Sequence, residues 1–259
     1  MRVAIIGFGE AGRAFAAGWH EERADLTLTA HDRAQDGSNA EAFRQAADAR
    51  GVALLGHDEA VAQADVVVSL VTADQALAVA RRAAPLMGAA HTFLDCNSVA
   101  PATKRKAADA ITGSGAAYVD CGVLGPVHPR RHRVPVGLAG PDPSVAQGLF
   151  PEVTHRFDTV GEAAALKLMR SIVIKGIEGV VMEALAACDG AGMRETVLAS
   201  LGPSFPGIDW PERAAYIEER VTSHGARRAA EMVEASRMLR DCGIEPMVSE
   251  GVARRLGQG

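Results

Sequence analysis

The feature that most constrains this chain is the alternation of short β-rich runs with alanine-rich helical stretches over its first 160 residues. Strands are expected at 2–6, 26–31, 64–71, 91–96, 116–121, 134–140 and 155–161, with helices at 11–22, 40–50, 74–86 and 101–112. The run ADVVVSLV at 64–71 is almost continuously apolar, as a parallel strand covered on both faces requires. Because such alternation builds a doubly wound parallel sheet, the sequence predicts a Rossmann-type α/β domain over residues 1–160.

The remainder of the chain, residues 161–259, has a helical pattern and no convincing strand. Helices are expected at 161–189, 194–201, 211–240 and 245–256, separated by glycine and proline. We therefore predict a smaller all-α domain that serves substrate binding and dimerisation. The helix at 211–240 carries apolar side chains around much of its circumference, and such a helix needs partners on more than one side. This pattern predicts a homodimer formed through the C-terminal helices, with a compact monomer as the alternative.

Composition and charge exclude several classes of function. The net charge of −5 gives no bulk attraction to nucleic acid or a membrane surface, and aromatic residues make up only 4% of the chain. No window holds the roughly 20 apolar residues of a membrane span, and the N-terminal apolar run breaks into glycines too early for a signal peptide. The cysteines show neither CxxC nor regular spacing, so neither a disulfide framework nor a metal site is expected. These features indicate a cytoplasmic protein that acts on a small molecule.

The first chemical motif, GFGEAG, directly follows the first predicted strand and opens the first predicted helix. Gly7 permits a tight turn, Gly9 lets the backbone approach a pyrophosphate, and Gly12 lets the helix pack closely on the strand. The helix N-terminus then faces the bound anion. The motif predicts a dinucleotide site made of Gly7, Phe8, Gly9, Glu10, Ala11 and Gly12, joined by Val71 and Thr72 at the end of the third strand. A glycine-rich turn without a ligand is the alternative.

The residues that follow the second predicted strand give conflicting signals about which dinucleotide is bound. Asp32 stands about 20 residues after the glycines, where a carboxylate binds the adenosine ribose hydroxyls and favours NAD. Arg33 comes next, where a guanidinium can pair with a 2′-phosphate and favour NADP. We expect either NAD or NADP, with a slight preference for NAD.

Two further segments carry polar side chains near predicted strand ends. In FLDCNSVAP, Asn97 and Ser98 follow a strand, at the edge where open α/β sheets bind ligands. They are expected to hydrogen-bond a nicotinamide or a substrate, or else to cap the helix that Pro101 begins. The basic run HPRRHR, residues 128–133, is either solvated surface or an anion pocket, since arginine pairs with carboxylates and phosphates.

The stretch GEAAALKLMRSIVIKG, residues 161–176, is apolar enough to wall a core, yet it carries two lysines. At about 100° per residue, Lys167, Ser171, Lys175 and Glu178 fall on one side of the predicted helix. That polar stripe is either a solvated face or the wall of a cleft between the two domains. In a cleft, Lys167 can exchange a proton with a hydroxyl or a carbonyl, because desolvation and nearby cations bring a lysine closer to losing its charge.

With these motifs taken together, the chain resembles the β-hydroxyacid dehydrogenase group, which includes 6-phosphogluconate dehydrogenase and 3-hydroxyisobutyrate dehydrogenase. The resemblance covers most of the first 190 residues. It rests on VAIIGFGEAG as the opening motif, LDCNSVAP as the D-x-S-T-x-x-P segment, DCGVLGP as the D-x-P-V-S-G-G loop and GEAAALKLMRS as the catalytic helix. Leu124 stands where the loop has serine, Pro126 where it has its second glycine, and Ser171 where the helix has asparagine. The C-terminal part is similar to a helical domain found in a subgroup of poorly defined function.

The resemblance implies an NAD(P)-dependent oxidoreductase that transfers a hydride between a nicotinamide and a hydroxy acid, an alcohol or an aldehyde. It makes Lys167 the general acid and base, and it gives the substrate oxygen to Ser171 and Asn97. The other implied contacts are, for the substrate, Gly122, Val123, Leu124, Gly125, Lys175 and His224, and, for the cofactor, Asn97 and Arg228. Lys175 and Glu178 are expected to pair with each other. An imine reductase and a non-enzymatic nucleotide sensor are the alternative functions.

Overall fold

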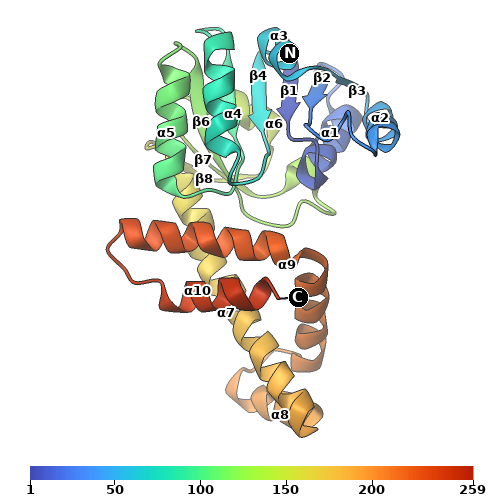
Figure 1. The fold of residues 1–259 in the computed structure, drawn as a ribbon, viewed down its shortest axis with the longest axis vertical. Coiled ribbons are helices and arrows are strands. Elements are labelled where there is room, and N and C mark those ends of the chain that lie inside the picture. Colours follow the sequence, from blue (N-terminus) through green and yellow to red (C-terminus); the bar gives the residue numbers. More distant parts are fainter. Residues whose placement is uncertain (259) are drawn as a thin grey trace. The chain divides into compact units, whose positions relative to one another are not determined.

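The computed structural model describes residues 1–258, which divide into two compact units (Figure 1). The first unit, Met1–Lys167, contains the α/β part, and the second begins at Leu168 and is helical. The division falls inside a long helix rather than at residue 160, because the first turn of that helix packs against a strand of the first unit. A Cβ on Gly122 of that strand would lie 2.5 Å from the carbonyl oxygen of Ala163 in the helix.

The first unit is built on one eight-stranded sheet. Its strands are β1 (Arg2–Ile6), β2 (Thr27–His31), β3 (Val52–Leu54), β4 (Val66–Ser69), β5 (Thr92–Asp95), β6 (Ala117–Val123), β7 (Val136–Ala139) and β8 (Val153–Phe157). Their spatial order is β3-β2-β1-β4-β5-β6-β7-β8. The predicted doubly wound sheet is confirmed through β6, but β7 runs antiparallel to β6 and β8 runs parallel to β7. The segment between β6 and β7 holds a short 3-10 turn (Arg131–Arg133) instead of a crossover helix, so the chain returns in the opposite direction.

Helices cover both faces of this sheet. They are α1 (Glu10–Glu22), α2 (Ala40–Asp48), α3 (His57–Gln63), α4 (Ala76–Ala83), α5 (Pro101–Thr112) and α6 (Ser144–Leu149). A 3-10 turn (Ala84–Leu86) completes the stretch expected to be helical at 74–86. The sequence pattern does not predict β3, α3 or α6, because runs of 3, 7 and 6 residues are too short to show a periodicity.

Neighbouring residues of β1 point to opposite faces of the sheet and fill two separate cores. Val3 and Ile5 belong to a cluster that includes Trp19 of α1, whereas Ala4 and Ile6 belong to a cluster with residues of α3, α4 and α5. The strand order reverses between β1 and β4, and the carboxyl ends of β1, β4 and β5 lie at one edge of the sheet. Such a reversal is where open α/β sheets bind their ligands.

The second unit is helical throughout its described part, residues 168–258. It contains most of α7 (Glu162–Ala191), followed by α8 (Arg194–Leu201), a 3-10 turn (Gly202–Ser204), α9 (Trp210–Asp241) and α10 (Met247–Leu256). Asp209 begins α9 by accepting a hydrogen bond from the backbone N–H of Glu212 at 2.9 Å. Its core includes Ile217 and Met232 of α9 with Leu256 of α10. Within residues 1–258, no helix combines the length and apolarity that crossing a membrane would require.

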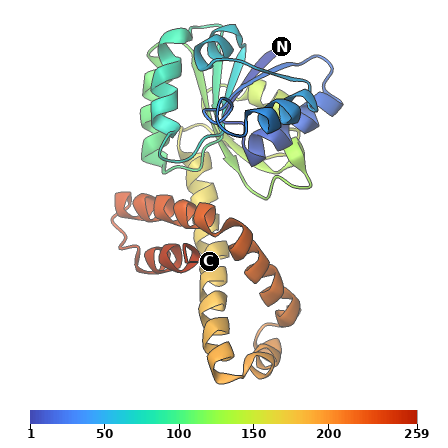
Figure 2. The same cartoon turned by 45° about the vertical axis from the view of Figure 1, so that its right-hand side comes forward.

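The helix predicted as continuous over 211–240 is bent in the structure. His224 has φ −140° and ψ 18°, outside the helical range, and the bend of α9 is visible in Figure 2. Ser223 and Gly225 flank His224, and kinks are common at such small residues. The two halves of α9 therefore point in different directions.

Candidate active site

The glycine-rich turn after β1 has the geometry that its spacing predicts. Gly7 has φ +99°, and a Cβ there would lie 2.5 Å from the carbonyl oxygen of Leu70. A Cβ on Gly12 would collide with the carbonyl oxygen of Gly7, whereas a Cβ on Gly9 would have no heavy atom within 4 Å. α1 begins at Glu10, which is exposed, and no side chain caps its first turn. The turn thus offers open space beside backbone N–H groups, as an anionic phosphate group requires.

Asp32 ties the end of β2 to this turn. Its carboxylate accepts hydrogen bonds from the backbone N–H of Phe8 at 2.8 Å and of Ala34 at 2.9 Å. Phe8 is completely buried, whereas Arg33 is exposed. A carboxylate has about four acceptor sites, so Asp32 retains capacity for ribose hydroxyls while it fixes the turn.

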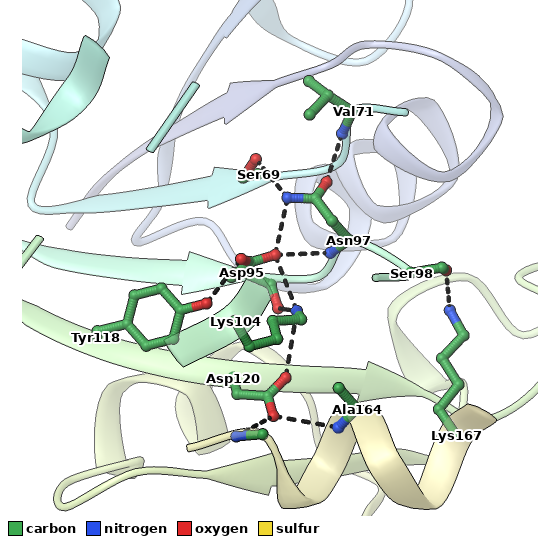
Figure 3. Close-up of polar contacts among 11 residues, drawn as sticks. Ser69, Val71, Asp95, Asn97, Ser98, Lys104, Tyr118, Asp120, Ala164 and Lys167 are labelled. Atoms are coloured by element: carbon green, nitrogen blue, oxygen red, sulfur yellow. Dashed lines mark hydrogen bonds and ion pairs between the residues drawn. The ribbon is translucent and has the colours of Figure 1, made fainter. Parts of the chain in front are cut away.

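Asn97 connects the loops after β4 and β5 (Figure 3). Its amide nitrogen donates to Ser69 Oγ at 2.9 Å and to Asp95 Oδ1 at 2.8 Å, and its Oδ1 accepts from the N–H of Val71 at 2.7 Å. The side chain is 3% exposed, and both amide hydrogens are used within the protein. This geometry favours a role in positioning the loops over direct contact with a substrate oxygen. α5 begins after Ala100 without a side-chain cap, so the capping alternative for Asn97 is not realised.

A buried lysine lies behind this loop. Lys104 of α5 is completely buried, and its Nζ lies 2.9 Å from Asp95 Oδ1 and 3.2 Å from Asp120 Oδ1. Burial alone would lower the pKa of Lys104, but the two carboxylates outweigh it and raise that pKa above its ordinary value. Tyr118 donates to Asp95 Oδ2 at 2.7 Å, and burial raises the pKa of that phenol. The charged Lys104 therefore lies between two adjacent buried carboxylates and offsets their repulsion.

Asp120 also fixes the start of α7. Its Oδ2 accepts hydrogen bonds from the backbone N–H of Gly161 at 3.0 Å and of Ala164 at 3.1 Å. One turn further along α7, the half-buried Lys167 donates from Nζ to Ser98 Oγ, and Figure 3 shows the two side chains meeting. Lys167 therefore is not part of a fully solvated helix face, and its ammonium reaches the same sheet edge as the glycine-rich turn.

The predicted substrate loop begins at the end of β6. Gly122 is buried, and Val123, Leu124 and Gly125 are half-buried. The backbone N–H of Leu124 donates to the carbonyl oxygen of Pro135 at 2.8 Å, so this part of the loop is held in place.

The basic run at 128–133 is largely paired with the end of α1. Arg131 forms an ion pair with Glu21, and Arg133 forms one with Glu22. His132 is buried with Nε2 3.4 Å from Glu22, and burial lowers its pKa. For these three residues the contacts favour ion pairing across the surface over an anion pocket.

The remaining predicted residues form a polar cluster in the helical unit. Lys175 Nζ donates to Glu231 Oε2 at 2.7 Å and to Ser171 Oγ at 3.1 Å. Glu178 forms an ion pair with Arg228 of α9, and Lys175 pairs with Glu231, so the expected pair of Lys175 with Glu178 is wrong. Burial lowers the pKa of Lys175, and the carboxylate of Glu231 opposes that shift. His224 is half-buried at the bend of α9.

Comparison with known proteins decides the family. Residues 2–161 match the model of the NAD binding domain of 6-phosphogluconate dehydrogenase. The chain belongs to this dehydrogenase family. Residues 189–258 match a second model, a domain of unknown function, DUF1932.

Solved structures similar to this dehydrogenase-family protein cover nearly its whole length. A conserved hypothetical protein from Sinorhizobium meliloti 1021 is 37% identical, with a TM-score of 0.77 over 99% of this chain and 87% of that one. Two structures below 25% identity share its fold. A Mycobacterium tuberculosis 3-hydroxyisobutyrate dehydrogenase is 19% identical, with a TM-score of 0.74 over 99% and 92% of the two chains. A Streptomyces aurantiacus imine reductase is 20% identical, with a TM-score of 0.65 over 100% and 94%.

Family membership and geometry agree on a nicotinamide dinucleotide as the cofactor class. The turn at Gly7 to Gly12, open at Gly9 and backed by the first turn of α1, lies inside the matched NAD-binding domain. Among residues 1–258, no group of histidine, cysteine, aspartate and glutamate has the arrangement of a metal site.

The charge network around Lys104 does not follow from the sequence motifs of this dehydrogenase-family protein. Asp95 and Asp120 stand inside the motifs, whereas Lys104 and Tyr118 belong to none of their expected binding or catalytic positions. One signal was present: Lys104 stands three, four and seven residues before the buried Ala107, Ala108 and Ile111, on the apolar face of α5. A lysine on a core face needs a buried counter-charge, and the two aspartates at successive strand ends were the candidates.

Proposed function

We propose that this protein is an NAD(P)-dependent oxidoreductase that transfers a hydride between a nicotinamide and a hydroxy acid, an alcohol or an aldehyde. The observation that carries the proposal is the hydrogen bond from Lys167 Nζ to Ser98 Oγ. It sets a titratable donor at the sheet edge where the glycine-rich turn leaves space for a dinucleotide. The family and fold comparisons support the same reaction class.

The cofactor is held by groups that the site already provides. The backbone around Gly9 and the first turn of α1 bind the pyrophosphate, and Asp32 accepts from the adenosine ribose hydroxyls. Val71 and Thr72 follow β4 beside this turn and contact the bound dinucleotide. The bound nicotinamide supplies or takes up the hydride. We infer a slight preference for NAD, since the carboxylate of Asp32 repels a 2′-phosphate that the exposed Arg33 attracts.

The protein's own contribution to the reaction is proton transfer and orientation. In reduction, the Lys167 ammonium gives a proton to the substrate carbonyl oxygen as the carbon receives hydride, which yields the alcohol. In oxidation, the neutral Lys167 amine accepts the proton of the hydroxyl. Ser98 accepts a hydrogen bond from Lys167, so its own hydroxyl hydrogen is available to the substrate oxygen. We assign the oxygen contact to Ser98 and give Asn97 the task of holding the loop.

The predicted contributions of the helical unit remain proposals. Ser171 is assigned to the substrate oxygen, Lys175 and His224 to the rest of the substrate, and Arg228 to the cofactor. The substrate loop, whose residues are Gly122, Val123, Leu124 and Gly125, is assigned to the substrate's far end. For each of these residues that has a side chain, removing that side chain should change the KM of substrate or the Kd of the dinucleotide.

Imine reduction is the second candidate. The likeness of this chain's fold to that of an imine reductase supports it, whereas Lys167 argues against it, because an aspartate or a tyrosine usually donates the proton in imine reduction. A non-enzymatic nucleotide sensor is the third.

A turnover screen separates these functions. The purified protein is mixed with NADH or NADPH and a panel of aldehydes, keto acids and cyclic imines, and with the oxidised dinucleotides and hydroxy acids, while absorbance of the reduced nicotinamide is followed. We expect turnover on carbonyls or hydroxy acids that Lys167→Ala removes and that the exposed control Lys106→Ala retains. Turnover on imines alone identifies an imine reductase. Saturable dinucleotide binding with no turnover on either panel contradicts the enzyme proposal and favours the sensor.

A further inference from the structure

One buried ammonium joins two elements that are far apart in the chain. Asp95 of β5 and Asp120 of β6 occupy paired positions on neighbouring parallel strands. Lys104 Nζ lies within 3.2 Å of an oxygen of each carboxylate, and its side chain is 0% exposed. Two buried carboxylates side by side repel each other strongly without a cation between them. Lys104 therefore supplies the cation that lies between the two aspartates and offsets their repulsion.

The Asp95 side of this network leads to Ser98. Asp95 Oδ1 accepts hydrogen bonds from the backbone N–H of Asn97 at 2.9 Å and from its side-chain amide at 2.8 Å. Lys104 Nζ also donates to the carbonyl oxygen of Asp95 at 2.6 Å. The loop residue immediately before Ser98 is thus fixed at its backbone and its side chain by a carboxylate that Lys104 holds.

The Asp120 side leads to Lys167. Asp120 Oδ2 accepts from the N–H groups of Gly161 and Ala164 in the first turn of α7. Lys167 lies three residues after Ala164, which is less than one helical turn of 3.6 residues. A shift of Asp120 therefore moves the helix start from which the Lys167 side chain extends.

We propose that Lys104 is a positioning residue that keeps Ser98 and Lys167 within hydrogen-bond reach, by holding Asp95 and Asp120 at a fixed separation. The proposal rests on the proposed function for its catalytic consequence, although the geometric link itself does not. Tyr118 provides a matched control, because its hydroxyl donates to the other oxygen of Asp95 and is buried in the same network. The Tyr118 hydroxyl donates to Asp95, so it does not bridge the two aspartates as Lys104 Nζ does.

The first test does not depend on any substrate. Lys104→Met keeps an unbranched side chain, one heavy atom shorter than lysine, and removes the positive charge. We expect amide hydrogen exchange to become faster by about tenfold both at Gly161 and Ala164 and at Asn97, while the amides of β2 stay protected. Acetylation of Lys167 by acetic anhydride should also rise relative to the exposed Lys106, because the contact with Ser98 is weakened. Tyr118→Phe should leave both measurements as in the wild type.

The second test asks whether the link matters for turnover. If the screen above finds a substrate, Lys104→Met should lower kcat by about 10- to 100-fold with substrate KM and dinucleotide Kd nearly unchanged, since misplacement of a reacting group costs rate more than binding. Tyr118→Phe should retain kcat within about twofold. If the wild type turns over nothing, the proposed function fails, and the exchange and labelling results still decide the geometric link.

A second, charge-balanced variant covers the case in which Lys104→Met does not fold. If Lys104→Met is insoluble, the double variant Lys104→Met with Asp120→Asn is measured in its place. The double variant removes one positive and one negative charge, so the net charge of the network is unchanged. A folded variant with wild-type exchange and wild-type Lys167 labelling overturns the proposal. So does a failure of both variants to fold, because Lys104 would then be needed for the fold itself and not for the site.

Discussion

Lys167 of α7 donates a hydrogen bond to Ser98, which follows β5 and lies 69 residues earlier in the chain. The contact depends on the register of β5 with β6 and on the cap that Asp120 gives to α7. It pairs an ammonium with a hydroxyl, the combination that can pass a proton to a substrate oxygen and orient it at once.

Lys167→Ala should lower turnover by at least about 100-fold while dinucleotide affinity stays nearly intact, because the general acid and base is lost and the glycine-rich turn is untouched. Steady-state kinetics and dinucleotide titration measure the two effects. Lys106→Ala, an exposed lysine on α5, is the matched control. Near-normal turnover of Lys167→Ala would remove this residue from the mechanism.

Two glycines of the same turn should respond differently to one added methyl group. Gly9→Ala should leave the melting temperature unchanged and weaken dinucleotide binding by at least about tenfold, because its Cβ meets no protein atom and enters the space for the pyrophosphate. Gly12→Ala should lower the free energy of unfolding by about 1–3 kcal/mol, because its Cβ collides with the carbonyl oxygen of Gly7. Thermal melts and fluorescence titration distinguish them. Full dinucleotide affinity in Gly9→Ala would show that the ligand binds elsewhere.

The contrast between these glycines and Lys104 shows what the sequence can predict. The turn at Gly7 to Gly12 is local, so residue spacing alone assigns a task to each glycine, and the structure agrees. Lys104 meets Asp120 only because β5 and β6 pair in a particular register, and no local pattern reports that pairing. The long strands and helices were predictable from their periodicity, whereas the direction of β7 and the bend at His224 depend on connections and packing.

Arg33→Ala should weaken NADP binding about fivefold and leave NAD binding nearly unchanged, since one exposed ion pair is worth roughly 1 kcal/mol. Asp32→Ala should weaken NAD binding. It should also loosen the glycine-rich turn, because the backbone N–H of Phe8 loses its hydrogen-bond acceptor. Isothermal titration of both dinucleotides against the wild type and both variants measures this. A strong NADP preference that survives Arg33→Ala would mean that neither Asp32 nor Arg33 contacts the adenosine ribose or its 2′-phosphate.

Glu231→Gln should destabilise the helical unit in a pH-dependent way. The pair of Lys175 with Glu231 has side-chain exposures of only 9% and 18%, so removing the carboxylate leaves a buried ammonium without its partner. We expect the free energy of unfolding to fall by roughly 2–3 kcal/mol near neutral pH. Glu41→Gln, which breaks an exposed pair with Arg44, should leave the free energy of unfolding nearly unchanged.

The sign of the pH dependence follows from Lys175. Burial lowers the pKa of Lys175 in the folded protein, and without Glu231 that pKa falls further. In the window between the folded pKa and the ordinary value of 10.5, the unfolded chain binds more protons than the folded one, so stability rises with pH. The gap between wild type and Glu231→Gln should therefore narrow as the pH is raised through that window. Urea denaturation at several pH values measures the gap, and a gap that widens with pH contradicts this assignment.

The last prediction is a homodimer that forms through the helical unit. We expect its interface on α7 and not on α9, because α7 carries the more exposed apolar side chains. On α9, the apolar residues Ile217, Val221 and Met232 are buried in the core of the helical unit. On α7, by contrast, Val173 and Val180 are 63% and 64% exposed. They line an apolar groove of about 1040 Å³ that α8, α9 and their connecting loop complete. An apolar face of this extent needs cover, and a second copy related by a two-fold axis is the commonest way to provide it.

Light scattering should therefore give twice the 27.0 kDa mass of one chain at micromolar concentration. Val180→Asp should yield the monomer, because a carboxylate among the residues that line the groove would lose its hydration on association. Ile244→Asp is the matched control: Ile244 is also exposed and apolar, but it lies in the turn between α9 and α10, outside the groove. A monodisperse 27.0 kDa wild type with full activity would leave the groove of α7 without a second copy.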